Sequence, residues 1–272
     1  MSLAASRQGY RGFSSLDLPS QNALEKGSDV SVGLKILKLE ENTVIWVARR
    51  RDNGASSVFK MYRNRGGVSW QREQLFRFRV EREYLALSFL VRHGIRCSIP
   101  DFWTYGCDQA HGRYEILCMR EIPKTAPLTD LGASGRLDEI DFAGVYDLVR
   151  QMHAAGFYHG ALNLRNFLAS VDETGVSQLF VIDTPQAMMF PQDIMGTRMA
   201  WVDLRQISGD IKRLVGTEKC RELLLRYGLD ESAAAKMIRD LDGPGKPLLL
   251  RNLLRFEFGL RSRFAFCCRR GR

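Results

Sequence analysis

The sequence predicts an α+β fold of two lobes, with a small antiparallel sheet in the first lobe and a mainly helical second lobe. Three observations predict it: short β-type runs dominate the first part of the chain, an amphipathic helix interrupts them, and a second amphipathic helix leads into a polar loop. The chain has 272 residues, 45% of them hydrophobic, so it can bury a sizeable core as one two-lobed domain. The expected parts are a mobile N-terminal arm at residues 1–28, a first lobe at 29–122, a second lobe at 123–247 and a basic amphipathic segment at 248–272.

The first lobe is expected to open with a hairpin and a third strand. Residues 35–39 and 43–47 are β-type runs, and the turn that joins them contains no glycine. Residues 56–62 form the next run, between two turns that do contain glycine. Lys60 is therefore expected in the middle of a strand, with apolar neighbours.

An amphipathic helix is expected at residues 71–92, where apolar side chains recur every three or four positions. The members of this stripe are Phe76, Val80, Tyr84, Leu87 and Val91. Glu83 lies nearer the stripe than Glu81 does, so we expect Glu83 to face inward and to pair with Lys60. Gly94 is a good terminator for this helix because glycine readily adopts the left-handed backbone conformation.

The next elements are a strand and a second helix. Residues 114–122 form an apolar strand that ends at Pro123. A helix follows, and its apolar positions are Phe142, Val145, Leu148, Val149 and Met152. We expect this helix to end at Gly156, directly before the polar loop.

The loop at residues 158–168 reads Y-H-G-A-L-N-L-R-N-F-L, and the apolar strand that follows it ends at Asp183. The pattern H-x-D-x-x-x-x-N, followed by a strand that ends in Asp, is typical of the catalytic loop and metal-binding strand of kinase-type phosphotransferases. His159 and Asn166 match this pattern, whereas Ala161 occupies the Asp position. Asn166 and Asp183 carry the oxygen atoms that Mg²⁺ prefers, so they are the candidate metal ligands.

The other loop residues receive different roles. His159 is expected to pack the loop and not to react. Ala161 marks a missing general base, a group that typically contributes about 10²–10⁴-fold to the rate. Asn163 could orient an acceptor hydroxyl but could not take its proton.

The order of five residues along the chain resembles the lipopolysaccharide kinase family, the Kdo/heptose kinase group of Gram-negative bacteria. This family is a compact branch of the protein-kinase-like fold. The five residues are Lys60, Glu83, His159, Asn166 and Asp183. The resemblance covers the chain from about residue 30 to about residue 240.

The resemblance implies phosphorylation of a sugar in the lipopolysaccharide inner core, dependent on ATP and Mg²⁺, at the cytoplasmic face of the inner membrane. It implies that Lys60 contacts the nucleotide phosphates and that adenine binds the backbone of Arg120, Glu121 and Ile122. The glycine-free turn predicts modest nucleotide affinity, because a glycine-rich loop lets backbone N–H groups approach phosphate closely. Two alternatives stay open: a weak kinase, or a pseudokinase that acts as a scaffold or regulator of envelope biogenesis without phosphotransfer.

The charge of the chain indicates anionic partners. Its formal net charge is +9, and residues 248–272 hold seven arginines and one glutamate beside an apolar stripe. This segment fits an interfacial helix on anionic lipid or the last helix of the second lobe, and we expect its Arg-rich tip at 269–272 to contact a membrane surface. Nucleic-acid binding is a remote third alternative that rests on this charge alone. The chain contains no zinc-finger, RNP or other recognised signature, so no nucleic-acid partner is expected. It also contains neither a secretory signal nor a spanning apolar stretch, so a cytoplasmic protein, either soluble or peripheral, is expected. The resemblance implies that a peripheral protein would lie at the inner membrane.

Asp203 has two alternative roles. It could anchor the backbone of the polar loop from the next helix, or it could cap that helix at its N-terminus.

Overall fold

A computed structural model describes residues 28–29, 34–40, 42–49, 56–64, 79–108, 112–171 and 177–242. The chain divides into two compact units, Met1–Pro123 and Lys124–Arg272. The predicted N-terminal arm, apart from Ser28, and the basic segment at 248–272 lie outside the described residues, so the mobile arm and the membrane-binding tip stay predictions. Within the described ranges, no helix is both long enough and apolar enough to cross a membrane.

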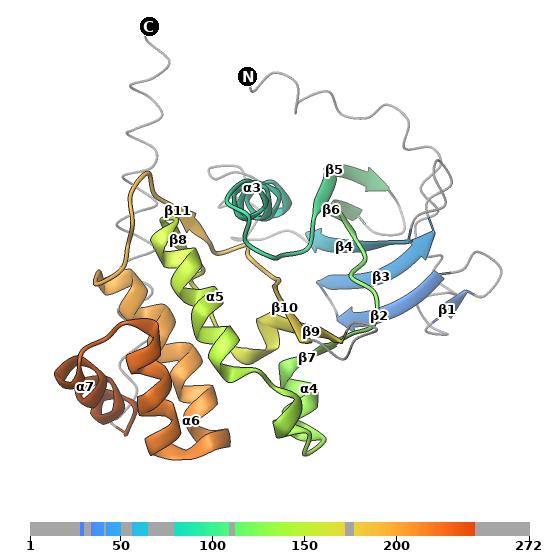
Figure 1. The fold of residues 1–272 in the computed structure, drawn as a ribbon. Coiled ribbons are helices and arrows are strands. Elements are labelled where there is room, and N and C mark those ends of the chain that lie inside the picture. Colours follow the sequence, from blue (N-terminus) through green and yellow to red (C-terminus); the bar gives the residue numbers. More distant parts are fainter. Residues whose placement is uncertain are drawn as a thin grey trace, which may run out of the picture. The chain divides into compact units, whose positions relative to one another are not determined.

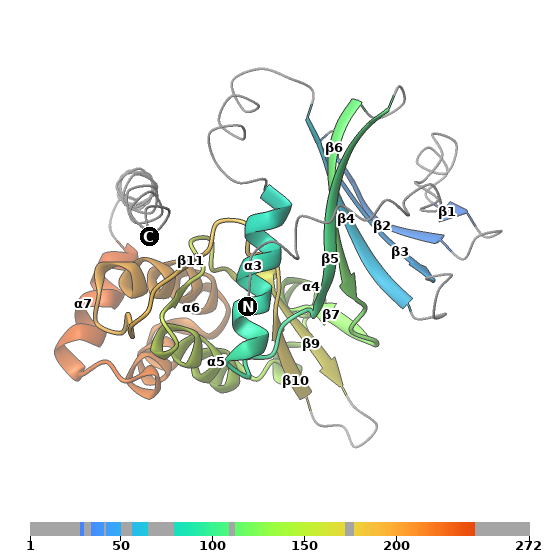
Figure 2. The ribbon, with the colours of Figure 1, turned by 90° about the horizontal axis from the view of Figure 1, so that it is seen from above.

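The first unit is built on one antiparallel sheet of six strands (Figure 1). In sheet order the strands are β1 (Ser28–Asp29), β2 (Leu34–Glu40), β3 (Thr43–Arg49), β4 (Ser56–Asn64), β6 (Gly112–Arg120) and β5 (Pro100–Asp108). The strand predicted to run through residue 122 ends at Arg120, before Glu121 and Ile122. Figure 2 shows helix α3 (Arg79–Arg92) beside the end of the sheet that β5 and β6 form. This sheet and the helices of the second unit confirm the predicted α+β class.

The alternation of side chains along β4 gives the sheet two different faces. On one face Trp46 lies opposite Phe59, and Phe59 lies opposite Cys118, so the three side chains form one buried row. The rings of Trp46 and Phe59 stack with their centroids 5.3 Å apart. Lys60 follows Phe59 and therefore points to the other face, where Leu117 is its neighbour on β6.

Helix α3 buries a stripe that differs in part from the predicted one. The buried residues are Val80, Glu83, Ala86, Leu87 and Leu90. Tyr84 is only half-buried, Val91 is exposed, and Phe76 lies outside the described residues. Positions 80, 83, 87 and 90 alternate steps of three and four, the spacing that places helix residues on one face. Glu83 is therefore a member of the buried stripe itself.

The second unit is mainly helical, with short strands beside the helices (Figure 1). Its helices are α4 (Leu128–Ala133), η4 (Leu137–Glu139), α5 (Phe142–Ala154), η5 (Leu164–Asn166), α6 (Arg198–Tyr227) and α7 (Glu231–Asp242). Its strands are β7 (Thr125–Pro127), β8 (Phe157–Tyr158), β9 (Phe167–Val171), β10 (Ser177–Val181) and β11 (Met188–Met189). Strands β10, β9 and β7 form one sheet, and β11 pairs with β8. The polar loop at residues 158–168 therefore begins at β8 and ends in β9.

Glycine residues end both α3 and α5, as the sequence predicts. Gly94 has a φ of 68° and Gly156 a φ of 83°, both in the left-handed region. Their surroundings differ. A Cβ atom at Gly94 would meet nothing within 4 Å, whereas one at Gly156 would lie 2.4 Å from the carbonyl oxygen of Phe190 and 2.6 Å from that of Gln192. Gly156 thus allows the backbone of α5 to approach the segment that precedes α6.

We expect Gly156→Ala to destabilise the protein by about 2 kcal/mol more than Gly94→Ala does. Both variants force alanine into the left-handed conformation, which costs about 1–2 kcal/mol. Only Gly156→Ala adds overpacking, which costs about 1–3 kcal/mol. Denaturant unfolding of the two variants beside wild type measures the difference, and equal losses would contradict the close approach at Gly156.

Candidate functional site

The first unit contains a buried ion pair between the sheet and α3. Lys60 Nζ lies 2.8 Å from Glu83 Oε1 and 3.2 Å from Glu83 Oε2. Lys60 is 6% exposed and Glu83 1%. Glu81 is only half-buried, so Glu83 is the partner that the sequence identified. A buried pair of this kind is costly to form, and removing either partner typically costs about 3–5 kcal/mol.

The segment predicted to bind adenine follows β6. Arg120 is exposed, and its backbone N–H donates to the carbonyl of Ile99 at 2.9 Å. The N–H of Glu121 donates to the carbonyl of Ser56 at 3.3 Å. Ile122 is half-buried. Two of the backbone donors proposed for adenine therefore already have partners inside the unit, and adenine recognition at this segment stays a prediction.

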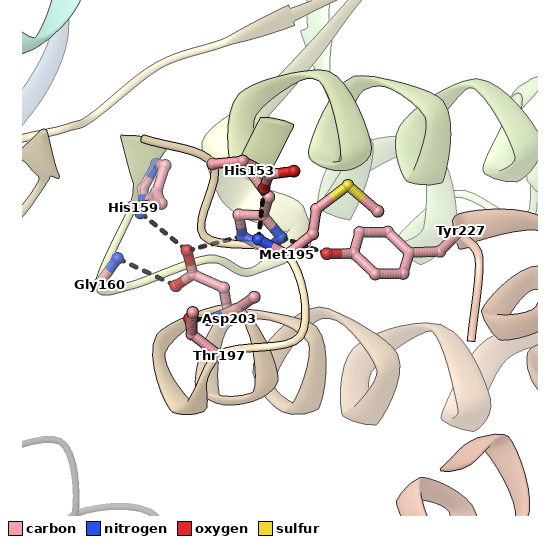
Figure 3. A network of polar contacts seen from close by, with 9 residues as sticks. His153, His159, Gly160, Met195, Thr197, Asp203 and Tyr227 are labelled. Carbon is pink, nitrogen blue, oxygen red and sulfur yellow. Dashed lines mark hydrogen bonds and ion pairs between the residues drawn. The ribbon is translucent and has the colours of Figure 1, made fainter. Parts of the chain in front are cut away.

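The polar loop of the second unit is anchored by a carboxylate that lies entirely inside the fold (Figure 3). Asp203 Oδ2 accepts a hydrogen bond from the N–H of His159 at 2.7 Å, and Asp203 Oδ1 accepts one from the N–H of Gly160 at 3.0 Å. Asp203 is 0% exposed and belongs to α6. The N-cap of that helix is Thr197, whose side chain accepts from the N–H of Ala200. Of the two roles open from the sequence, Asp203 has the loop-anchoring one.

His153 contacts the Asp203 carboxylate, and Tyr227 contacts His153 (Figure 3). The sequence analysis identified neither residue. His153 Nε2 lies 3.4 Å from Asp203 Oδ2, and His153 Nδ1 lies 2.7 Å from the hydroxyl of Tyr227. Burial and the nearby carboxylates of Asp193 and Asp203 raise the pKa of the Tyr227 phenol, which keeps it neutral. Both ring nitrogens of His153 are therefore engaged, one by Asp203 and one by Tyr227.

A second carboxylate of α6 anchors the other half of the loop. Asp210 Oδ2 accepts a hydrogen bond from the N–H of Leu164 at 3.1 Å. Asp210 follows Asp203 by seven residues, two turns along the same helix face, so both carboxylates face the loop. Sequence reasoning did not select Asp210. The spacing of two aspartates by seven residues on the helix after the loop is the signal that could have found it.

Further bonds join the loop to the end of strand β10. His159 Nε2 lies 3.2 Å from the carbonyl oxygen of Ile182, and the N–H of Ile182 donates to the carbonyl of Asn166 at 2.9 Å. His159 is 0% exposed, which places its ring in the packing position expected for it. These bonds hold Asn166 close in the fold to Asp183, the residue after Ile182.

The two loop asparagines share one backbone acceptor. Asn166 Nδ2 donates to the carbonyl of Ala161 at 2.7 Å, and Asn163 Nδ2 donates to the same carbonyl at 3.1 Å. Each amide oxygen is therefore directed away from Ala161. Asn163 Oδ1 is buried and has no hydrogen-bond partner within the described part of the chain. The side chain of Ala161 itself adds only a methyl group to this surface.

These residues fit a divalent cation that also binds phosphate. The amide nitrogen of Asn166 donates to the carbonyl of Ala161, so the amide oxygen of Asn166 is the atom that can ligate a metal. Asp183 has a φ of 59°, a conformation that aspartate adopts more readily than most residues. Among the described residues, no group of three His, Cys, Asp or Glu side chains could hold a metal ion. Asn166 and Asp183 carry the oxygen ligands that Mg²⁺ prefers, and their role as metal ligands stays a prediction.

Comparisons with known proteins relate the chain to one family and to one fold. The model of the lipopolysaccharide kinase (Kdo/WaaP) family matches residues 39–213. Among solved structures, WaaP in complex with acyl carrier protein is similar with a TM-score of 0.54 and 18% sequence identity, over 87% of this chain and 91% of that chain. At that identity the likeness shows a shared fold. A comparison with curated proteins finds no match.

We expect Asp203→Asn to lower the free energy of unfolding by about 3 kcal/mol, because the amide group would turn an N–H toward one of the two loop N–H groups and leave it unpaired. Denaturant unfolding measures the loss.

The matched control is Asp147→Asn, which breaks an ion pair between α5 and Arg226 whose partners are partly exposed. Such pairs contribute about 0–1 kcal/mol. If Asp203→Asn cost no more than Asp147→Asn, the Asp203 carboxylate would not be the anchor of the loop.

Proposed function

Because the chain belongs to the lipopolysaccharide kinase (Kdo/WaaP) family, we propose that it binds ATP with Mg²⁺ and transfers a phosphoryl group to a sugar of the lipopolysaccharide inner core. The observation that carries this proposal is the buried pair of Lys60 and Glu83. A lysine kept charged at 6% exposure costs stability, and a role in binding phosphate gives a reason for that cost.

Each side chain has a defined task in this proposal. Lys60, held by Glu83, is the group proposed to bind the nucleotide phosphates. Asn166 and Asp183 are the groups proposed as oxygen ligands for Mg²⁺, which would supply neutralisation of the phosphate charge. The bonds from the two α6 carboxylates keep the loop of Asn166 in one conformation. This division of tasks matches a reaction in which the protein mainly positions the reactants.

The acceptor side of the reaction is where the chain departs from the kinase pattern. Ala161 cannot take a proton from a sugar hydroxyl. The transition state of phosphoryl transfer is loose and demands little of a base, so we propose weak phosphotransfer. The alternative is a pseudokinase that binds nucleotide and serves as a scaffold or regulator of envelope biogenesis.

Nucleotide binding is expected to stabilise the protein only when Mg²⁺ is present. A ligand that binds the folded state at 100 times its Kd adds about 2.7 kcal/mol to stability. Thermal unfolding with ATP and Mg²⁺, ATP with EDTA, and no ligand measures this effect. Asp183→Asn keeps the size and backbone tolerance of the residue but removes the charge, so it should abolish the Mg²⁺-dependent shift. No shift in wild type at millimolar ATP and Mg²⁺ would rule out the proposed nucleotide site.

Ala161→Asp tests the missing base. Asn163 and Asn166 both donate to the backbone carbonyl of Ala161, so a change of the side chain at this position keeps both hydrogen bonds. For a kinase that lacks only its base, we expect a gain of about 10²-fold in ADP release with lipopolysaccharide core acceptors.

Three outcomes separate the alternatives in this experiment. A gain that Asp183→Ala abolishes would support a weakened kinase. Unchanged nucleotide binding with no turnover in either protein would favour the pseudokinase. Robust wild-type turnover that Ala161→Asp does not improve would show that another group serves as the base.

A further inference from the structure

The ion pair of Lys60 and Glu83 has a third member, Tyr62. The hydroxyl of Tyr62 donates to Glu83 Oε2 at 3.0 Å. Tyr62 lies two residues after Lys60 on β4, so both side chains project from the same face of the sheet toward α3. Tyr62 is 6% exposed, which places its hydroxyl in the same buried environment as the ion pair.

The three distances show how the carboxylate is shared. Lys60 makes its shorter contact with Oε1, at 2.8 Å, and its longer contact with Oε2, at 3.2 Å. Tyr62 donates to Oε2, the oxygen that is farther from Lys60 Nζ. A buried carboxylate oxygen requires donors, and an ammonium group has three of them. The phenol therefore gives Oε2 a second donor and fixes the orientation of the carboxylate that Lys60 contacts.

The surroundings of Tyr62 hold its ring and the start of α3 in place. The guanidinium of Arg79 lies 4.0 Å from the centroid of the Tyr62 ring, and Lys60 Nζ lies 5.3 Å from it. Tyr62 is the cross-strand neighbour of Glu115, whose carboxylate accepts from the N–H of Val80 in the first turn of α3 at 3.1 Å. One row of the sheet therefore binds α3 both near its start and at Glu83.

We propose that Tyr62 is a positioning residue for nucleotide binding: its hydroxyl fixes the orientation of the Glu83 carboxylate, and the carboxylate in turn sets the position of the Lys60 ammonium group for phosphate. This inference rests on the proposed function. It predicts that removing one oxygen atom from Tyr62 weakens ATP binding through Lys60, although Tyr62 itself does not touch the nucleotide.

The test is Tyr62→Phe, which removes the hydroxyl and keeps the ring that Arg79 covers. Thermal unfolding is titrated with ATP at constant Mg²⁺, and each variant is referred to its own transition without ligand, so that a simple loss of stability cancels. The shift grows with the logarithm of the ATP concentration and has no plateau, so the variants are compared at one fixed shift. We expect the ATP concentration that produces this shift to rise about fivefold or more, as the loss of a hydrogen bond to a charged group predicts.

Tyr146→Phe is the matched control. Tyr146 is also buried, and its hydroxyl lies 2.7 Å from Ser208 Oγ in the second unit. Its loss should lower the unliganded transition but leave the ATP titration unchanged. If Tyr62→Phe leaves the titration unchanged while wild type shifts, the inference is overturned and the proposed function stands. If wild type shows no shift at all, the proposed function fails and this inference fails with it.

Discussion

The buried carboxylate of Asp203 is the interaction on which the candidate site of the second unit depends. It satisfies two consecutive backbone N–H groups, of His159 and Gly160, at the point where the chain leaves β8. Backbone N–H groups without partners are costly inside a protein, so the loop conformation is stable only while this acceptor is present. Asp210 accepts a further hydrogen bond from the N–H of Leu164. The side chains of Asn163 and Asn166 both donate to the carbonyl of Ala161 within the loop. The geometry of Asn166 thus rests on a helix that begins at Arg198.

In the first unit the candidate site depends on the buried ion pair of Lys60 and Glu83. The alternation of β4 directs Phe59 into the apolar row and Lys60 to the opposite face, where α3 supplies a carboxylate. A hydrophobic pair of similar volume would often give equal or greater stability at such a position. The ion pair therefore departs from the arrangement that stability alone favours, and departures of this kind are expected at functional sites.

At Ala161 the loop conformation depends on the backbone, whereas catalysis by a general base would depend on the side chain. The loop uses the backbone of this residue, since its carbonyl receives both asparagine amides, and these bonds do not depend on the side chain. A catalytic carboxylate can therefore be absent while the loop keeps its conformation. For this reason membership of the lipopolysaccharide kinase family describes the scaffold more firmly than it describes turnover.

By itself the sequence determined the order of those strands and helices that it predicted, the position of Lys60 in a strand, the inward-facing Glu83 and the glycines that end α3 and α5. These features depend on patterns that repeat within a few residues, where backbone geometry alone relates one side chain to the next. Only the tertiary structure decided that Asp203 anchors the loop, that Asp210, His153 and Tyr227 support it, and that Tyr62 shares Glu83. Those contacts join residues 44 and 46 apart at the loop, and 74 apart between His153 and Tyr227. The buried stripe of α3 was also decided by packing, because several helix faces satisfied its apolar spacing and the sheet selected one of them.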